Sequence, residues 1–210
     1  MPRRPASLPP EVAAALLERW REPHRRHHGE RHLTEVLAAV ALLADPTEDT
    51  EAVDLAAWYH DAVYAGRPDD EVRSATLDSA QLTSTGADPA LAAEVVRLVL
   101  LTRNHDPAPG DRPGALLCDA DLSVLGADPR RYRAYVAAVR AEYPHVDDTG
   151  WRTGRTAVLP RVTYSPRGED TAFGAALFGA YAASGARPGA GPLPDFADRF
   201  RPVPAFAALT

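Results

Sequence analysis

The sequence contains a single cysteine, Cys118, and this scarcity excludes an internal disulfide framework. A reducing cytoplasm is therefore the expected location. The chain also lacks any run of about twenty uninterrupted apolar residues, so no membrane-spanning helix is expected. Its first residues, MPRRPASLPPEV, are partly basic but lack the apolar segment of a secretory signal. Together these absences predict a soluble cytoplasmic protein.

Lysine and isoleucine are absent altogether, so all 23 basic residues are arginines. They are outnumbered by 29 acidic residues, which gives a net charge of −6. An acidic chain lacks the overall basic footprint of a nucleic-acid-binding protein, and no nucleic-acid partner is expected. The sequence leaves the oligomeric state open, and a homodimer is among the states that it allows.

Strand patterns are nearly absent, whereas apolar residues recur at helical spacing along most of the chain. The composition, 45% hydrophobic and 25% charged, is ordinary for a globular domain. Helices are expected over residues 11–20, 32–44, 52–64, 70–82, 88–102, 114–126 and 128–143, with two weaker ones around 150–163 and 168–183. From Gly185 onwards proline and glycine are frequent, which is typical of an irregular tail. We therefore predict an all-α fold, with one helical domain over residues 1–184 and a Pro/Gly-rich tail over residues 185–210.

Three histidines and three arginines fall within eight positions, RRHHGERH, at residues 25–32. Residues four apart share one face of a helix, so His28 and His32 are expected to stack and to continue the apolar stripe of Val36 and Val40. This places His32 beside the core, where a buried imidazole needs a partner. The spacing alone fits either a metal ligand or a core histidine that is hydrogen-bonded to a carbonyl.

Two other apolar segments carry unexpected polar residues. The doublet His60-Asp61 lies within WYHDAVY, and Asp119 and Asp121 lie within LLCDADLSVLG. Adjacent residues on a helix diverge by about 100°, so the doublet cannot fill one core stripe, but it can converge on one ion. A buried carboxylate needs a cation or several hydrogen-bond donors. Imidazole and carboxylate ligands suit a divalent Mn, Mg, Ni, Zn or Fe ion, and we predict such a site with His32 as a member.

The order His32, His60-Asp61, Asp121 resembles that of the HD superfamily of metal-dependent phosphohydrolases, and in particular a bacterial subfamily of predicted members. The matching stretches are EPHRRHHGERHL, AAWYHDAVY, DEVRSA, LTRNH, DADLSVLG, YRAYVAAVRAEY and TGRTAVL, between residue 22 and about residue 160. The resemblance implies an HD-domain-like helical bundle. The chain departs from the subfamily at His27, where an aromatic residue is usual.

Carried over by position, the resemblance makes His32, His60, Asp61 and Asp121 the metal ligands. Of the two aspartates in DAD, it favours Asp121 over Asp119, which would then be a neighbouring or structural residue.

The resemblance also places His28 and His105 beside the substrate. Related proteins have extra histidines at these positions, which bind substrate phosphate or a second metal, and each of the two also fits a hydrogen-bonded neighbour of the site. Arg25 is the best candidate to bind phosphate, because guanidinium groups suit phosphate oxygens and this one lies next to the first histidines. Further candidates are Arg26, Arg140 and Arg155.

The expected function is hydrolysis, by a metal-activated water, of a phosphoester or phosphoanhydride in a small phosphorylated metabolite. The resemblance implies a nucleotide-like substrate. Asp61 and Glu71 are the candidate proton carriers, although Glu71 equally fits a solvated residue at a helix N-terminus. One alternative is an HD-type di-iron oxygenase, in which His28 and His105 hold a second iron. Another is a non-catalytic module that binds a nucleotide.

Overall fold

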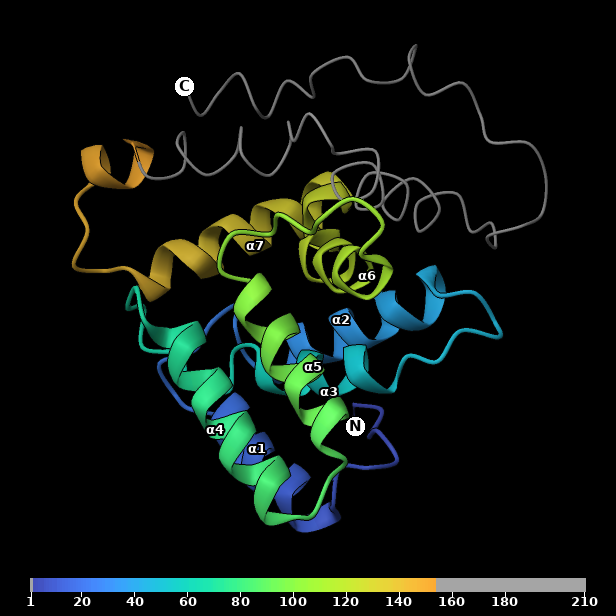
Figure 1. Cartoon of the computed structure of the whole chain (residues 1–210). Coiled ribbons are helices and arrows are strands. Elements are labelled where there is room, and N and C mark those ends of the chain that lie inside the picture. Colours follow the sequence, from blue (N-terminus) through green and yellow to red (C-terminus); the bar gives the residue numbers. More distant parts are fainter. Residues whose placement is uncertain (1, 154–210) are drawn as a thin grey trace, which may run out of the picture.

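The computed structural model describes residues 2–153, and within them every regular element is a helix (Figure 1). The elements are α1 (Pro10–Trp20), α2 (Glu30–Leu43), α3 (Glu51–Tyr59), α4 (Asp70–Ser84), α5 (Pro89–Leu101), α6 (Arg112–Asp121), the 3-10 helix η1 (Leu122–Gly126) and α7 (Pro129–Glu142). The all-α prediction is confirmed for this part of the chain. No helix in these residues has both the length and the apolar character needed to cross a membrane.

Aspartate caps mark the starts of three helices. The Asp88 side chain accepts hydrogen bonds from the backbone N–H groups of Ala90 and Leu91, and Asp128 does the same at the start of α7. The Asp111 side chain accepts one from the N–H of Gly114 in α6. Each cap satisfies N–H groups that have no partner inside the helix, and a proline in the first turn already has the helical φ. These local signals explain why the starts of α5 and α7 agree with the prediction.

Helix α3 is the centre of the core. All of its residues from Val53 to Tyr59 are buried, and it packs against α2, α4, α5 and α6. The fully buried indole of Trp20 in α1 donates a hydrogen bond to the carbonyl of Trp58 at 3.0 Å. A helix that is apolar on nearly every side is stable only when other helices enclose it. The segment that follows α3 is consequently held in the interior of the molecule.

Four helices pack around α3 as two pairs (Figure 1). Helices α4 and α5 form an antiparallel pair, while α2 packs against α6. Helix α7 crosses one end of the molecule and packs on η1, where Tyr132, Tyr135 and Val139 form a second, smaller core. This arrangement brings α2, the end of α3 and the end of α6 to one place.

Two predicted boundaries are wrong. The helix expected over residues 52–64 ends at Tyr59, and the one expected over 114–126 changes from α to 3-10 geometry after Asp121. The chain is again helical from residue 148 to residue 153, within the first of the two weaker helices. The rest of that helix, the one around 168–183 and the domain boundary after residue 184 lie outside the described residues.

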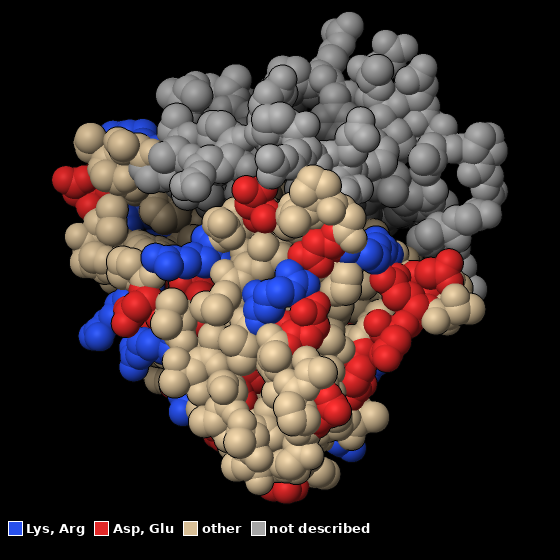
Figure 2. Space-filling model, viewed as in Figure 1, with Lys and Arg blue, Asp and Glu red and all other residues tan. Residues whose placement is uncertain are grey.

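Charged side chains on the face shown in Figure 2 lie in mixed groups, with arginines beside acidic residues. Arg97 pairs with Glu94 and Asp111, and Arg112 pairs with Glu48. Exposed pairs of this kind stabilise a fold only slightly, but they neutralise one another. This face therefore presents no continuous basic surface.

Candidate metal centre

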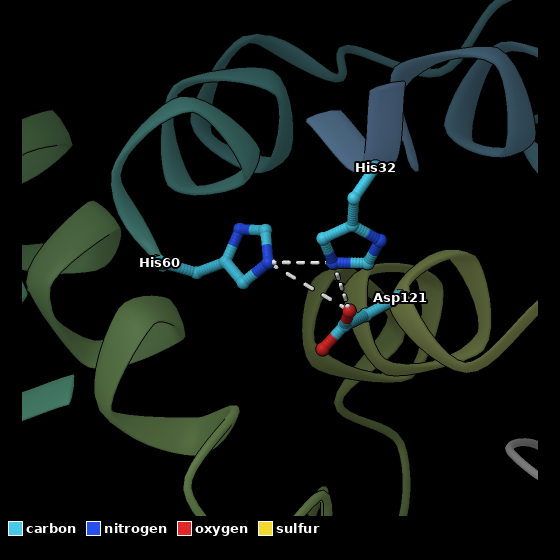
Figure 3. Close-up of side chains that lie close together, drawn as sticks. All are labelled: His32, His60 and Asp121. Carbon is cyan, nitrogen blue, oxygen red and sulfur yellow. Dashed lines mark hydrogen bonds and ion pairs between the residues drawn. The ribbon is translucent and has the colours of Figure 1, made fainter. Parts of the chain in front are cut away.

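Three helices bring His32, His60 and Asp121 together, and they form a group of three potential ligands whose donor atoms all lie within 4.8 Å of one another (Figure 3). His32 lies on the buried face of α2 with Val36 and Val40, as predicted. His60 immediately follows α3, and Asp121 is the last residue of α6. These side chains converge because the three helix ends meet in the core.

The distances between these atoms match a small metal ion. His32 Nε2 lies 2.9 Å from Asp121 Oδ1 and 3.2 Å from His60 Nε2, and His60 Nε2 lies 3.7 Å from the same oxygen. Asp61 Oδ2 lies 3.4 Å from His60 Nε2 and 3.8 Å from His32 Nε2. Ligands about 2.1 Å from a tetrahedral ion are separated by about 3.4 Å. The residues present therefore fit a divalent ion, with Asp61 beside the group of three.

Hydrogen bonds orient these ligands. The carbonyl of Ala57 lies 2.9 Å from His60 Nδ1, so it accepts the Nδ1–H and leaves the Nε2 lone pair facing the centre. His105 Nε2 lies 2.7 Å from Asp121 Oδ2, the oxygen that is turned away from His32. Burial raises the pKa of Asp121, but the surrounding histidines, through charge and hydrogen bonds, hold it well below its usual value. Asp121 is therefore a carboxylate, which is the form that binds a metal.

The centre is buried on one side and accessible on the other. The ring of Trp20 lies 5.4 Å from that of His60, and only 3% of the His32 side chain is exposed. Asp61 and Asp121 are more accessible, with 16% and 12% of their side chains exposed. Metal sites that catalyse reactions keep a position open to substrate, and the partly exposed side of the two aspartates, called the open side below, is where a substrate would approach.

The His60-Asp61 doublet lies in a turn, and the prediction that it sits inside a helix is wrong. The guanidinium of Arg25 donates hydrogen bonds to the carbonyls of Asp61 at 2.7 Å and Ala62 at 3.3 Å. It also donates to the carbonyl of His28 at 2.9 Å. These carbonyls lie outside any helix and need other donors, which an arginine from a distant segment supplies here.

The side chain of Arg25, predicted to bind substrate phosphate, is instead buried and already bonded. Only 1% of its side chain is exposed, and its Nε donates to Glu22 at 3.0 Å. A phosphate oxygen would have to displace these hydrogen bonds. Arg25 instead connects the histidine-rich segment to the turn that carries the doublet.

His28 precedes α2, so it does not share a helix with His32 as predicted, but the two rings still meet edge to face with centroids 5.7 Å apart. Its Nδ1 lies 2.7 Å from Glu142 Oε2, and its ring stacks on that of Tyr64. Glu142 Oε1 accepts hydrogen bonds from the backbone N–H groups of residues 26, 27 and 28. His28 is therefore a hydrogen-bonded neighbour of the centre whose position α7 determines.

Glu142 is a residue of this site that the sequence analysis missed. One signal did exist: it is an acidic residue in the last turn of a helix, where the helix dipole disfavours negative charge. Three N–H groups and a histidine compensate for that cost. Burial raises the pKa of Glu142, but these hydrogen bonds and the His28 charge lower it to about 2.

The other predicted residues lie around the centre. His105 contacts Asp121 rather than open space, and its φ of 51° is the one left-handed backbone value at a non-glycine residue in the described chain. Glu71 is half-buried at the start of α4, and burial, followed by the charges of Asp61 and Asp70, raises its pKa. Asp119 is buried in α6 but does not belong to the group of three.

The remaining arginine candidates lie in three different settings. Arg140 bonds to the carbonyls of Tyr143 and Val146 and to Asp148. Arg26 is exposed, and Arg155 lies outside the described residues.

The two aspartates of α6 give a direct test of the centre. Asp121→Asn is expected to weaken binding of Mn²⁺ by more than about 10-fold, because it removes the charge that faces both histidines. Asp119→Asn, a buried change of the same chemistry two residues away, should leave the affinity nearly unchanged. Calorimetric titration of both metal-free variants measures this difference, and equal affinities would exclude Asp121 as a ligand.

Comparisons of the chain with models of protein families, with curated proteins and with solved structures each found no match.

Proposed function

We propose that the protein is a metal-dependent phosphohydrolase of the HD superfamily, built on an HD-domain-like helical bundle. The observation that carries this proposal is the convergence of His32, His60 and Asp121 from three helices, with Asp61 beside them. Two imidazoles and a carboxylate suit a divalent transition metal. Their order along the chain is also the order of the ligands in the family that the sequence resembles.

A divalent ion held there would polarise a phosphoryl oxygen and lower the pKa of a water molecule that attacks phosphorus. The chain's own residues would hold the ion and move protons. His105 keeps Asp121 in place by its hydrogen bond, and the Ala57 carbonyl fixes the ring of His60. Both interactions hold the ligand side chains in place, so these side chains would need to move less when the ion binds.

Asp61 and Glu71 are the proposed proton carriers. Asp61 lies at the open side of the centre, within 3.4 Å of a histidine nitrogen. Burial raises the pKa of Glu71, and the charge of Asp61 raises it further. A raised pKa brings a carboxyl group closer to neutral pH, where it both accepts and donates protons efficiently. Glu71 thus fits protonation of the leaving group, and Asp61 fits orientation of the water.

The proposed substrate is a small phosphorylated metabolite of the nucleotide type. An oxygenase would need further histidines for a second iron. In the structure, His28 is bonded to Glu142 and His105 to Asp121. These hydrogen bonds favour the hydrolase over the di-iron site.

Metal analysis and hydrolysis together test the proposal. Protein purified without chelator or a nickel column should hold about one equivalent of a divalent metal and release phosphate from some member of a panel of phosphorylated metabolites. His60→Ala should lose both properties. His145→Ala, which removes an exposed histidine that packs on Tyr143, should keep them.

Two results would contradict the proposal. About two equivalents of iron with oxygen-dependent turnover would indicate the oxygenase instead. Absence of metal, even after reconstitution, would show that the histidines and carboxylates form only a hydrogen-bonded core.

A further inference from the structure

The candidate centre is surrounded by negative charge, which a phosphorylated substrate has to overcome. Asp61 and Asp121 lie at the centre itself. Glu71 lies within electrostatic range of Asp61 and of Asp70. One bound divalent ion compensates for only part of this charge. A further cation is therefore needed at the open side, and Arg25 is already bonded to carbonyls.

Arg103 is a cation whose side chain is available. It is exposed in the turn that follows α5, and its guanidinium makes no hydrogen bond or ion pair among residues 2–153. By contrast, Arg97 on α5 and Arg131 on α7 are both bound to carboxylates. An exposed guanidinium without such a partner retains its donors for a ligand.

Two observations place Arg103 beside the centre. It precedes His105 by two residues, so their Cα atoms are at most about 7 Å apart, and the His105 ring bonds to Asp121. Independently, the charge of Arg103 lowers the pKa of Glu71, which the charge of Asp61 raises. The guanidinium thus lies within electrostatic range of Glu71, on which Asp61 also acts, and two residues before the histidine that contacts Asp121.

The turn itself explains this position. The N–H of Arg103 bonds to the carbonyl of Leu100, and the N–H of His105 bonds to that of Leu101. His105 itself adopts the left-handed conformation, at φ 51°. For a non-glycine residue this conformation is uncommon and costs energy, and such residues concentrate at functional sites.

We propose that Arg103 binds the phosphoryl group of the substrate through its planar pair of N–H donors. This inference rests on the proposed function and specifies its substrate as a phosphomonoester. A monoester has one non-bridging oxygen more than a diester, so it can contact the ion and still offer two oxygens to a guanidinium fork. The structural alternative is that Arg103 only complements the negative end of the α5 dipole.

Binding of inorganic phosphate to the metal-loaded protein tests this role without requiring turnover. Arg103→Ala should weaken phosphate binding by about 10- to 100-fold, the range expected when a charged hydrogen bond is lost. Arg103→Lys should restore only part of the affinity, because an ammonium group cannot form the fork. Arg133→Ala, which removes an exposed arginine from α7, should leave the affinity unchanged.

Kinetics with a phosphomonoester provide the second measurement. Arg103→Ala should raise KM more than it lowers kcat, and it should retain the wild-type metal content and helical circular-dichroism signal. Equal phosphate affinity in wild type and Arg103→Ala, or equal losses in Arg103→Ala and Arg133→Ala, would overturn the inference.

Failure of the proposed function gives a different result. In that case the wild-type protein binds metal and phosphate, and Arg103→Ala impairs phosphate binding, but no phosphorylated compound is hydrolysed. Absence of phosphate binding by the metal-loaded wild type would overturn the Arg103 inference directly.

Discussion

Asp78→Asn is expected to stabilise the folded protein at about pH 8, because the wild-type side chain is a buried carboxylate without compensation. Asp78 is fully buried in α4, and neither of its carboxyl oxygens has a hydrogen-bond partner in the described residues. Burial raises its pKa to about 7. The hydroxyl of Tyr59, also buried and without a hydrogen-bond partner, has its pKa raised by burial and by the charge of Asp78.

The direction of the pH dependence follows from how many protons the folded and the unfolded states bind. Below the usual aspartate pKa of about 4 both states hold the proton; between about pH 4 and pH 7 the folded state keeps it and the unfolded state releases it. The free energy of unfolding therefore falls as the pH rises through this window, by up to about 4 kcal/mol. Asparagine cannot ionise, so the free energy of unfolding of the variant does not fall in this way.

Urea unfolding at a series of pH values, with chelator present so that metal binding does not contribute, measures the effect. The stability difference between Asp78→Asn and wild type should increase from about pH 5 to about pH 8. Asp70→Asn is the matched control on the same helix. Its carboxylate accepts hydrogen bonds from the N–H groups of Ala65 and Arg67, so this variant should lose stability at pH 8. A pH-independent difference for Asp78→Asn would show that Asp78 is ionised or compensated in the fold.

Glu142→Ala is expected to destabilise the protein by about 3 kcal/mol at neutral pH and to release the histidine-rich segment from α7. Only 1% of the Glu142 side chain is exposed, and it accepts hydrogen bonds from three backbone N–H groups, from His28 and from Tyr64. Its removal leaves these donors without a partner. Glu142→Gln keeps the oxygen that faces the backbone but replaces the one bonded to His28, so it should have a smaller effect.

The pH dependence of Glu142 has the opposite sign to that of Asp78. Its folded-state pKa of about 2 lies below the usual value of 4.5, so its contribution is complete above about pH 4.5 and is lost as the pH falls towards 2. Chemical unfolding of the variants at about pH 7 and pH 3 measures this, since the variants should differ less from wild type in acid. Glu94→Gln, at the exposed pair with Arg97, should change stability by less than about 0.5 kcal/mol. A Glu142→Ala variant as stable as this control would contradict the anchoring role.

Several features could be predicted because they depend on neighbouring residues. Apolar spacing located the helices, and Asp88-Pro89 and Asp128-Pro129 marked helix starts that the structure reproduces. The same spacing placed His32 on the buried face of α2. The choice of Asp121 over Asp119 came from the family resemblance, and the structure places Asp121 beside the histidines.

The errors concern contacts between residues that are far apart in the chain. Arg25 and Asp61 are 36 residues apart, and His28 and Glu142 are 114 apart. No periodicity indicates that a guanidinium will satisfy carbonyls in the turn after α3, or that a glutamate will bind the segment before α2. The sequence therefore suggested a helical doublet and a His28 in the same helix as His32, whereas the structure has the doublet in a turn, His28 before α2 and Arg25 bonded to carbonyls.

The sequence by itself determined the helical class, most helix positions and the polar residues that do not suit an apolar core, since these follow from local spacing and side-chain chemistry. Only the tertiary structure decided which of those residues meet. Packing around α3 brings His32, His60 and Asp121 within 4.8 Å of one another, directs Arg25 and His28 to structural partners and leaves Arg103 exposed. The physical reason is that burial fixes how helices are placed relative to one another, and that placement determines which polar groups share a site.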